Sequence, residues 1–591
     1  MSDAAPVTPL VRTTKMRVVA QDPSVGASNG KAILTALVDV PAEVLASGPR
    51  GYRVQVVDYD ASTRRLYPPL DPGDSSEAWM AAPDSTVPDS VILEDPRFHA
   101  RNTYALIMRT LARFEFALGR RIRWGFANEG HQINVAPHAF ADANAFYSQR
   151  DEALLFGYFA SRSGNRNVFS CLSHDIVVHE TTHALLDGLR NRYMEPSSPD
   201  QAAFHEGFAD VVALLSVFAQ QEVVAALMDR PLDGRARQRG LEAGVLMKED
   251  AKLENLRDST LSAVAEEFGK EMSPIGRSSL RHSATMTPSK DALKQFIEAH
   301  DRGEIVVAVM LNAFLAVWAT RLQQLFRDPR TRFIDRTRAA EEGARVADYL
   351  LTLAIRALDY APPVHLEFGT YLTAMLTADR EVRPADELQL RQQLRDWFGR
   401  FGITPAAVSG DGAWLQPASR FSFERTRFES MQRDADEVFR FVWENRDRRK
   451  LSLYEGAYTR VISVRPCFRF APEDGFVLRE TVAEVLQQIR LSAGELSRYG
   501  VRQPDGMPSE ADVMLFGGLT LVFDEYGGVK YVIGDAVLDP TRPEVQERQS
   551  ARLQSLWERG FYSKKKFSMR RFSAVHRRRA LSSLAQIHEE W

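Results

Sequence analysis

The sequence has few of the features that mark secreted, membrane or disulfide-rich proteins. Only two of its 591 residues are cysteines, Cys171 and Cys467, too few for a disulfide framework at this length, which favours a reducing compartment. The first residues contain no apolar segment typical of a secretion signal. The longest apolar run, residues 305–319, is too short to span a membrane and predicts a buried core helix. We therefore expect a cytoplasmic protein without membrane contact.

The chain also lacks a strong charge of one sign. Its formal net charge is -3 at pH 7, with 44% hydrophobic and 26% charged residues, which is typical of a soluble globular protein and gives no overall attraction to nucleic acid or membrane. One basic stretch, residues 561–580, leaves a nucleic acid or an acidic partner open. A solvated helix face or tail has the same pattern. Nothing in the sequence indicates the oligomeric state.

A chain of this length is too long for one hydrophobic core, so two to four domains are expected. Alternating β-branched segments predict strands near the N-terminus, and a stretch rich in Pro, Ser and Asp at 71–90 predicts a linker. Apolar residues at helical spacing predict a helix over 95–118 and a mostly helical region over 285–400. The predicted division is a β-rich N-terminal region at 1–90, a central domain at 91–400, a helical connector at 401–450, and an α+β domain with a basic tail at 451–591.

The segment DIVVHETTHALLDGL contains candidate metal-binding residues. His179 and His183 are four residues apart, so on a helix both imidazoles lie on one face and can bind one metal ion. Glu180, next to the first histidine, can take a proton from a water on that metal. Zinc fits this set because it lowers the pKa of its bound water to about 7. The HExxH pattern alone also arises by chance, so further ligands are needed.

A second segment, AAFHEGFADVVALLSVF, supplies further candidate ligands. A catalytic zinc site has three protein ligands and one open position, and Glu206 is the natural third ligand beside His179 and His183. Asp210, one helical turn after Glu206, can hold the second ring nitrogen of a ligating histidine and fix its tautomer. The apolar neighbours of both carboxylates predict a buried helix, where such groups need a partner. A solvated helix face is the alternative.

At this point the sequence resembles the thermolysin-like gluzincin zinc metallopeptidases. Residues 179–187 match the pattern HExxHAxxD, and Glu206 and Asp210 match the downstream ExxxD. Upstream, ANAFYS at 143–148 resembles the edge-strand motif with which the family binds an extended peptide. The resemblance covers roughly residues 95–320. It implies an α+β, zincin-like catalytic domain with a mostly helical C-terminal lobe, in which the side chain of Asn144 and the backbone of Ala145 bind substrate.

The resemblance further implies a donor for the oxyanion of the tetrahedral intermediate. The best match is His300, which precedes an apolar helix and could instead only cap it. His282 and His365 are weaker substitutes. Tyr193 stands near the position of the family's tyrosine, one residue off in spacing, and a surface-loop residue is the alternative. His205, beside Glu206, can orient a ligand or simply fill polar space.

Two nearby residues are assigned simpler roles. Asp175 matches a calcium-binding position of the family, but no further carboxylate cluster follows Asp210, so we expect Asp175 to cap the HExxH helix and no calcium of that kind. Cys171, eight residues before His179, could be a thiolate ligand of zinc, and its more ordinary interpretation is a small buried residue.

The prediction is a zinc-dependent endopeptidase that hydrolyses peptide or protein substrates, with Zn²⁺ as cofactor and Glu180 as general base. The first alternative is a zinc aminopeptidase, since HEGFA at 205–209 resembles the phrase holding the third ligand of those enzymes. Their exopeptidase motif is not found here. The second alternative is a non-catalytic zincin-fold scaffold that keeps zinc for structure. Such a site would not need the carboxylate of Glu180.

Overall fold

The computed structural model describes residues 12–20, 23, 33–71, 88–126, 131–161, 166–194, 197–228, 244–257, 283, 285–328, 330–386, 388–406, 410–447, 449–471, 475–558 and 560. Most of the linker expected at 71–90 lies outside these residues. His282 and the basic stretch 561–580 lie wholly outside them.

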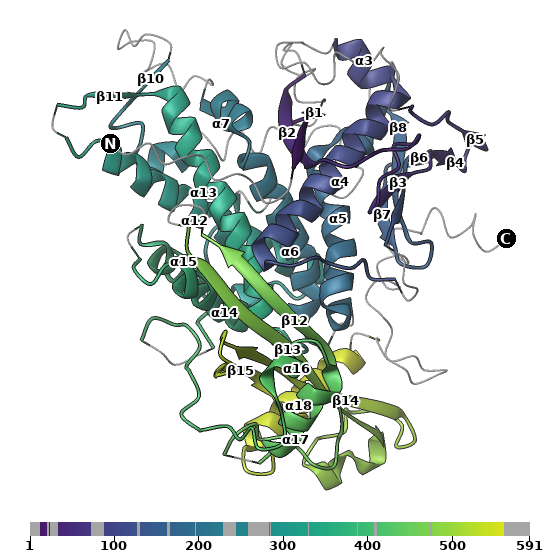
Figure 1. The fold of residues 1–591 in the computed structure, drawn as a ribbon, viewed down its shortest axis with the longest axis vertical. Coiled ribbons are helices and arrows are strands. Elements are labelled where there is room, and N and C mark those ends of the chain that lie inside the picture. The colour runs from purple at the N-terminus through teal and green to yellow at the C-terminus, as the bar shows by residue number, and fades with distance from the viewer. Residues whose placement is uncertain are drawn as a thin grey trace.

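Helices and strands are both abundant in the described residues, which confirms the α+β class in general (Figure 1). The α-helices are α3 (Asp89–Glu94), α4 (Pro96–Leu118), α5 (His174–Leu189), α6 (Pro199–Phe218), α7 (Gln221–Met228), α11 (Ala292–Gln295), α12 (Ala299–Leu325), α13 (Arg336–Arg356), α14 (Phe368–Val382), α15 (Leu390–Arg400), α16 (Phe428–Met431), α17 (Ala435–Glu444) and α18 (Pro543–Glu558). Short 3₁₀ helices are η2 (Ser170–Leu172), η3 (Asn191–Met194), η5 (Ala357–Tyr360) and η6 (Ala493–Tyr499).

The strands in the described part of the chain fall into five sheets. Three of these are two-stranded ribbons, β1 (Thr13–Val19) with β2 (Thr35–Pro41), β4 (Tyr59–Asp60) with β5 (Arg65–Leu66), and β10 (Val245–Met247) with β11 (Phe333–Asp335). A five-stranded sheet has the order β3 (Val54–Val56), β6 (Ile133–Phe140), β8 (Ala153–Ala160), β7 (Ala145–Ser148), with β9 (Asn167–Phe169) also pairing β8. An antiparallel sheet has the order β12 (Tyr458–Phe470), β13 (Val477–Ser492), β14 (Asp512–Phe523), β15 (Val529–Asp535).

Local sequence accounts for several predicted elements. The helix expected over 95–118 is α4, because the Asp95 side chain accepts a hydrogen bond from the Arg97 backbone and Gly119 ends the helix with φ 66°. The segment INVAPHAF forms β6, and the hairpin expected near residue 527 joins β14 to β15. The helical region expected over 285–400 is also confirmed by α11 to α15.

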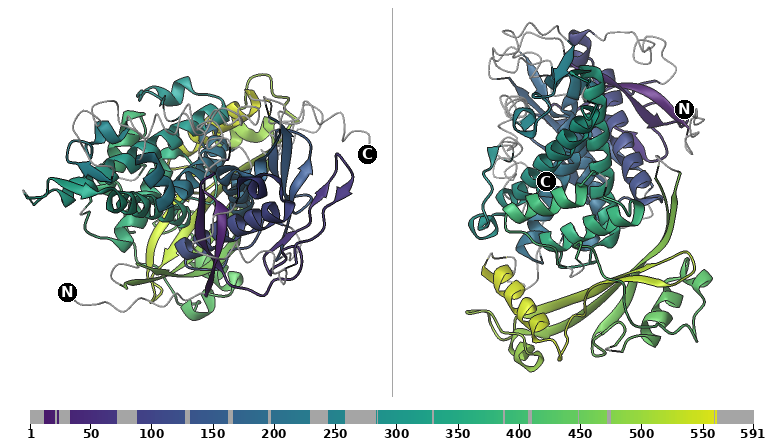
Figure 2. Two further views of the ribbon diagram at one scale, coloured as in Figure 1. Left: turned by 90° about the horizontal axis from the view of Figure 1, so that it is seen from above. Right: turned by 90° about the vertical axis from the view of Figure 1, so that its left-hand side faces the viewer.

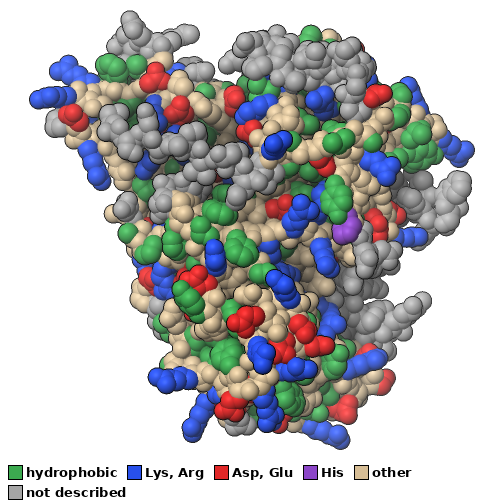
Figure 3. All heavy atoms as spheres, viewed as in Figure 1, with side chains coloured by type: hydrophobic (Ala, Val, Ile, Leu, Met, Phe, Trp, Pro, Cys, Tyr) green, Lys and Arg blue, Asp and Glu red, His purple; other side chains and the backbone are tan. Residues whose placement is uncertain are grey.

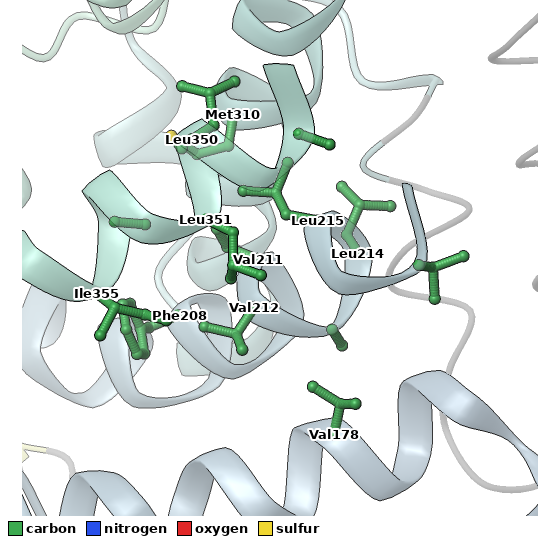
Figure 4. Close-up of a cluster of buried hydrophobic side chains, with 14 of the residues drawn as sticks. Val178, Phe208, Val211, Val212, Leu214, Leu215, Met310, Leu350, Leu351 and Ile355 are labelled. Atoms are coloured by element: carbon green, nitrogen blue, oxygen red, sulfur yellow. The ribbon is translucent and has the colours of Figure 1, made fainter. Parts of the chain in front are cut away.

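Helix α12 contains the long apolar run and is the core helix that the sequence predicts. It is long and apolar enough to cross a membrane by composition, but 89% of its apolar window is buried inside the fold. Helix α6 packs against it, and α5 and α13 flank α6, with Val178, Val212 and Leu351 among the buried side chains of the cluster that these helices form (Figure 4). The helix that carries Glu206 is therefore held by packing on several sides.

The N-terminal strands share the main core. Val18 and Val40 belong to the same buried cluster as the helices α4, α5 and α6, and β3 pairs with β6 in the five-stranded sheet. The boundary predicted near residue 90 therefore does not separate two hydrophobic cores. The domain boundaries stay predictions.

The four-stranded sheet β12–β15 lies at one end of the helical region (Figure 2). It is fastened there by buried charges: Arg469 of β12 pairs with Asp359 at 2.5 Å and also with Glu480. Arg465 of β12 donates to the backbone carbonyl of Leu189 at the C-terminal end of α5, at 2.9 Å, where a cation also complements the helix dipole. The sheet thus supports the helix that carries HExxH.

Acidic and basic side chains are interspersed on the face seen in Figure 3, where neither sign forms a continuous field. This arrangement agrees with the small net charge of the chain.

Helices α6 and α12 approach each other at two glycines. A Cβ on Gly207 would lie 2.6 Å from the backbone oxygen of Gly303, and a Cβ on Gly303 would lie 2.9 Å from that of Ala203. We expect Gly207→Ala to force the helices apart and to destabilise the fold by about 1–3 kcal/mol, seen as a lower denaturation midpoint. The control is Gly399→Ala in α15, where no atom lies within 4 Å of the added Cβ and a gain of about 0.5–1 kcal/mol is expected. Equal midpoints for the two variants would contradict the close-approach argument.

Candidate metal centre

Helix α5 carries the two histidines at its centre. Ser173 is its N-cap residue, and His179 and His183 lie one turn apart, with ring centroids 4.5 Å apart and ring planes at 88°. Their Nε2 atoms face each other at 2.9 Å. The helix expected from the spacing is present, and its geometry turns both Nε2 atoms toward one point.

The carboxylate of Glu206 closes the triangle from α6. Its Oε2 lies 3.6 Å from His179 Nε2, and its Oε1 lies 3.6 Å from His183 Nε2. The three candidate ligand atoms all lie within 4.8 Å of one another. Bonds of about 2.0–2.2 Å in a tetrahedral site place neighbouring ligand atoms roughly 3.3 Å apart. The three side chains therefore fit a zinc ion after the imidazoles separate by a few tenths of an ångström.

Two more α6 side chains hold the imidazoles in place. Asp210 Oδ1 lies 2.8 Å from His179 Nδ1, a contact that favours the ring hydrogen on Nδ1 and leaves Nε2 as the candidate ligand atom. His205 stacks on His183 with centroids 4.6 Å apart and planes at 9°. Both were expected near the site from the sequence, and both orient a ring.

Glu180 lies on the side of α5 that faces strand β7. Its Oε2 accepts a hydrogen bond from the backbone N–H of Tyr147 at 3.1 Å. The hydroxyl of the same tyrosine donates to Asp187 Oδ2 at 2.9 Å, two turns further along α5. Tyr147 therefore ties β7 to α5 at two points. Its role was missed in the sequence, although Glu180 and Asp187 stand seven residues apart, a spacing that puts both on one helix face.

Strand β7 is the last strand in the order of its sheet and runs antiparallel to β8. Gly157 N–H donates to the carbonyl of Asn144, so the alternation of an antiparallel pair turns the backbone groups of Ala145 and Tyr147 away from β8. This agrees with the edge position expected for the backbone of Ala145. The side chain of Asn144 bonds locally, because its Oδ1 accepts from the Ala145 N–H at 2.8 Å.

His300 lies at the start of α12, close to the candidate ligands. Its Nδ1 is 3.9 Å from Glu206 Oε2, and its side chain is 43% exposed. The capping role is filled by Glu298, whose side chain accepts from the His300 and Asp301 backbone. The ring of His300 thus borders the site from the solvent side.

Tyr193 lies in the interior of the fold. It is fully buried, its hydroxyl donates to the backbone carbonyl of Pro362 at 2.6 Å, and its ring packs against Phe204. Burial raises the pKa of Tyr193 to about 12. This placement does not support the predicted catalytic role of Tyr193 and gives it a packing role instead, because the hydroxyl is already bound inside the fold.

Asp175 and His365 make other contacts than their expected roles require. Asp175 lies in the first turn of α5 and accepts from the Ser173 hydroxyl, so the N-cap position belongs to Ser173 and not to Asp175. His365, a weaker candidate for the oxyanion donor, contacts the Phe516 carbonyl of β14 at 2.8 Å. Burial lowers its pKa well below the usual value.

The structure also assembles a group that the sequence did not suggest. His99, His138 and Cys171 come from α4, β6 and η2, and their candidate ligand atoms lie within 4.8 Å of one another. No local spacing links these residues along the chain, so no sequence motif announces the group.

No protein-family model matches this chain, and no curated protein matches it in sequence. The function therefore has to be argued from the geometry of the site.

We expect Asp210→Asn to lower the affinity of the α5–α6 site for zinc by about 10–100-fold, because loss of the carboxylate weakens the basicity and orientation of His179. Titration of the metal-free chain with zinc against a competing chelator measures this. The matched control is Asp175→Asn, a buried aspartate in α5 that contacts Ser173, for which unchanged affinity is expected. Equal affinities for the two variants would refute the role of Asp210.

Proposed function

We propose that this protein is a zinc-dependent endopeptidase with a zincin-like, gluzincin catalytic domain. The observation that carries the proposal is the convergence of His179, His183 and Glu206 from two helices within reach of one ion. The donor set, two imidazoles and a carboxylate, is the one that catalytic zinc sites of hydrolases use with a fourth position left open.

A zinc ion in this site would supply Lewis acidity, polarising a carbonyl and making water acidic enough to act near neutral pH. The residues of the chain then have separate tasks. Glu180 takes the proton of the attacking water and later delivers it to the leaving amine. Its neighbour Tyr147 holds the carboxylate by its backbone N–H, at 3.1 Å. His300, exposed and next to Glu206, can donate to the oxygen that becomes negatively charged.

The edge of β7 supports a peptide as substrate. The carbonyl groups of Ala145 and Tyr147 point away from β8, so they can accept hydrogen bonds from an extended peptide that lies along the strand. The N–H groups of the same two residues already donate, to Asn144 Oδ1 and to Glu180. The same strand contacts Glu180, which brings a bound peptide bond toward the general base. Asn144, expected to bind substrate through its amide, would have to release the Ala145 N–H to do so.

The central test is Glu180→Gln. The substitution keeps the shape of the side chain and removes the base, so zinc content should stay unchanged while peptide hydrolysis falls by about 10²–10⁴-fold. A peptide library read by mass spectrometry reports cleavage, and elemental analysis reports zinc. Asp175→Asn on the same helix serves as the control and should retain activity. Full hydrolysis by Glu180→Gln would remove Glu180 from the mechanism.

The same library separates the alternatives. An endopeptidase cleaves N-blocked and free peptides alike, whereas an aminopeptidase requires the free amine. A non-catalytic scaffold would hold zinc and cleave neither class. Cleavage confined to free N-termini would replace the endopeptidase proposal by the aminopeptidase one.

His300→Ala tests the oxyanion role. We expect kcat to fall by about 10²–10³-fold with little change in KM, because the donor acts on charge that develops only in the transition state. Zinc content should not change, since His300 is not one of the three proposed ligands. His131→Ala is the control, because His131 is an exposed histidine that stacks on Tyr52. An unchanged kcat in His300→Ala would exclude this role.

A further inference from the structure

The group formed by His99, His138 and Cys171 lies outside the site described above. The three residues are almost fully buried, with exposed fractions of 1%, 1% and 0%. Their candidate ligand atoms nevertheless face one another within 4.8 Å. Polar groups in an apolar interior need hydrogen-bonding or metal partners to offset the loss of hydration.

The outer nitrogens of both rings are already committed. His138 Nδ1 lies 2.6 Å from Asp58 Oδ2, and His99 Nε2 lies 2.8 Å from the carbonyl oxygen of Ile92. Asp58 also accepts from the His138 backbone N–H at 2.9 Å through its other oxygen. Since a carbonyl and a carboxylate accept hydrogen bonds, each outer nitrogen carries the hydrogen of its ring.

The inner nitrogens then face each other as two lone pairs. His138 Nε2 and His99 Nδ1 are 2.7 Å apart. Two neutral imidazoles carry two hydrogens, both used by the outer contacts, so nothing remains to bridge the inner pair. Two lone pairs at this distance repel, and a cation between them removes the repulsion.

We propose that His99 Nδ1, His138 Nε2 and Cys171 Sγ form a second metal site that takes a thiophilic divalent transition-metal ion, with Zn²⁺ as the first candidate. Imidazole and thiolate are the donors that this class of metal prefers. The outer contacts to Asp58 and to the Ile92 carbonyl are the carboxylate–histidine and carbonyl–histidine contacts that orient metal-bound rings. On binding, the Cys171 thiol loses its proton to solvent and the sulfur bonds the metal.

Charge supports a divalent ion. With a metal bound, a Cys171 thiolate and the carboxylate of Asp58 would together carry two negative charges, and both residues are at least nine-tenths buried. A divalent cation balances these two buried charges. Cys171 is buried, as the sequence predicts, and the proposal adds a ligand role to it.

The position of the site indicates a structural role. It joins α4, β6 and η2, and Cys171 stands two residues before Ser173, the N-cap of α5. The rings of Tyr67 and Phe169 pack against His138 with centroids 4.8 and 5.1 Å away, which closes the group off. A metal here would fix the start of the helix that carries HExxH.

Metal content of the full chain tests the proposal. After loading with zinc and removal of free metal, we expect about two ions per wild-type chain, about one in His183→Ala and about one in Cys171→Ser, because each variant loses one ligand of one site. Cys467→Ser is the matched control, since Cys467 is also a buried cysteine, and should retain both ions. Failure of Cys171→Ser to fold in the presence of zinc, while Cys467→Ser folds, agrees with a structural site. In that case cobalt binding to the wild-type chain decides the proposal.

Cobalt substitution tests the thiolate directly and needs no variant to fold. Co²⁺ bound by Cys171 gives the wild-type chain a sulfur-to-cobalt charge-transfer band in the near ultraviolet, whereas the donors of the α5–α6 site include no sulfur. The band should persist in His183→Ala and Cys467→Ser, and be absent from Cys171→Ser. Absence of the band from the folded, cobalt-loaded wild type would overturn the proposal and leave a proton between the two rings. A persistent band in a chain without peptidase activity would overturn the peptidase proposal alone.

Discussion

One carboxylate, that of Glu206, is the point on which the α5–α6 site depends. It lies between two imidazoles of another helix, 3.6 Å from each, and a buried carboxylate is stable only with a cationic or hydrogen-bonding partner. Packing places it there: α6 contacts α12 at Gly207, the residue after Glu206, so closely that no side chain fits. This close crossing of α6 and α12 brings Glu206 and His300 together.

The groups around this carboxylate are held by rigid elements. Glu180 is bonded to the backbone of β7, and Tyr147 joins the same strand to Asp187 near the end of α5. The C-terminal end of α5 is also held by Arg465 of the C-terminal sheet, which donates to the Leu189 carbonyl. Glu180, its helix and the sheet edge beside it therefore keep a fixed relation, which the proposed reaction would require.

What could be predicted from the sequence follows from the range of each interaction. His179, Glu180 and His183 are within one helical turn, and helix geometry alone fixes their relation. Glu206 needed a second helix and was found because its own segment carries the i, i+4 pair with Asp210. Tyr193 was misplaced because it follows the end of α5, where the chain turns into η3 and the hydroxyl reaches Pro362 instead. Residue spacing predicts which side chains share a face only as far as the helix extends.

The group at Cys171 marks the limit of that reasoning. His99, His138 and Cys171 belong to three elements, 39 and 33 residues apart along the chain, and each looks alone like an ordinary core residue. Their contact exists only because α4 packs on the sheet and on η2. The two clusters differ in the property that separates catalytic from structural metal sites, which is access to the fourth position. At Glu206 a half-exposed histidine borders the ligands, whereas at Cys171 the ligands are buried and closed by aromatic rings. The first arrangement suits the proposed catalytic role, and the second suits the proposed structural one.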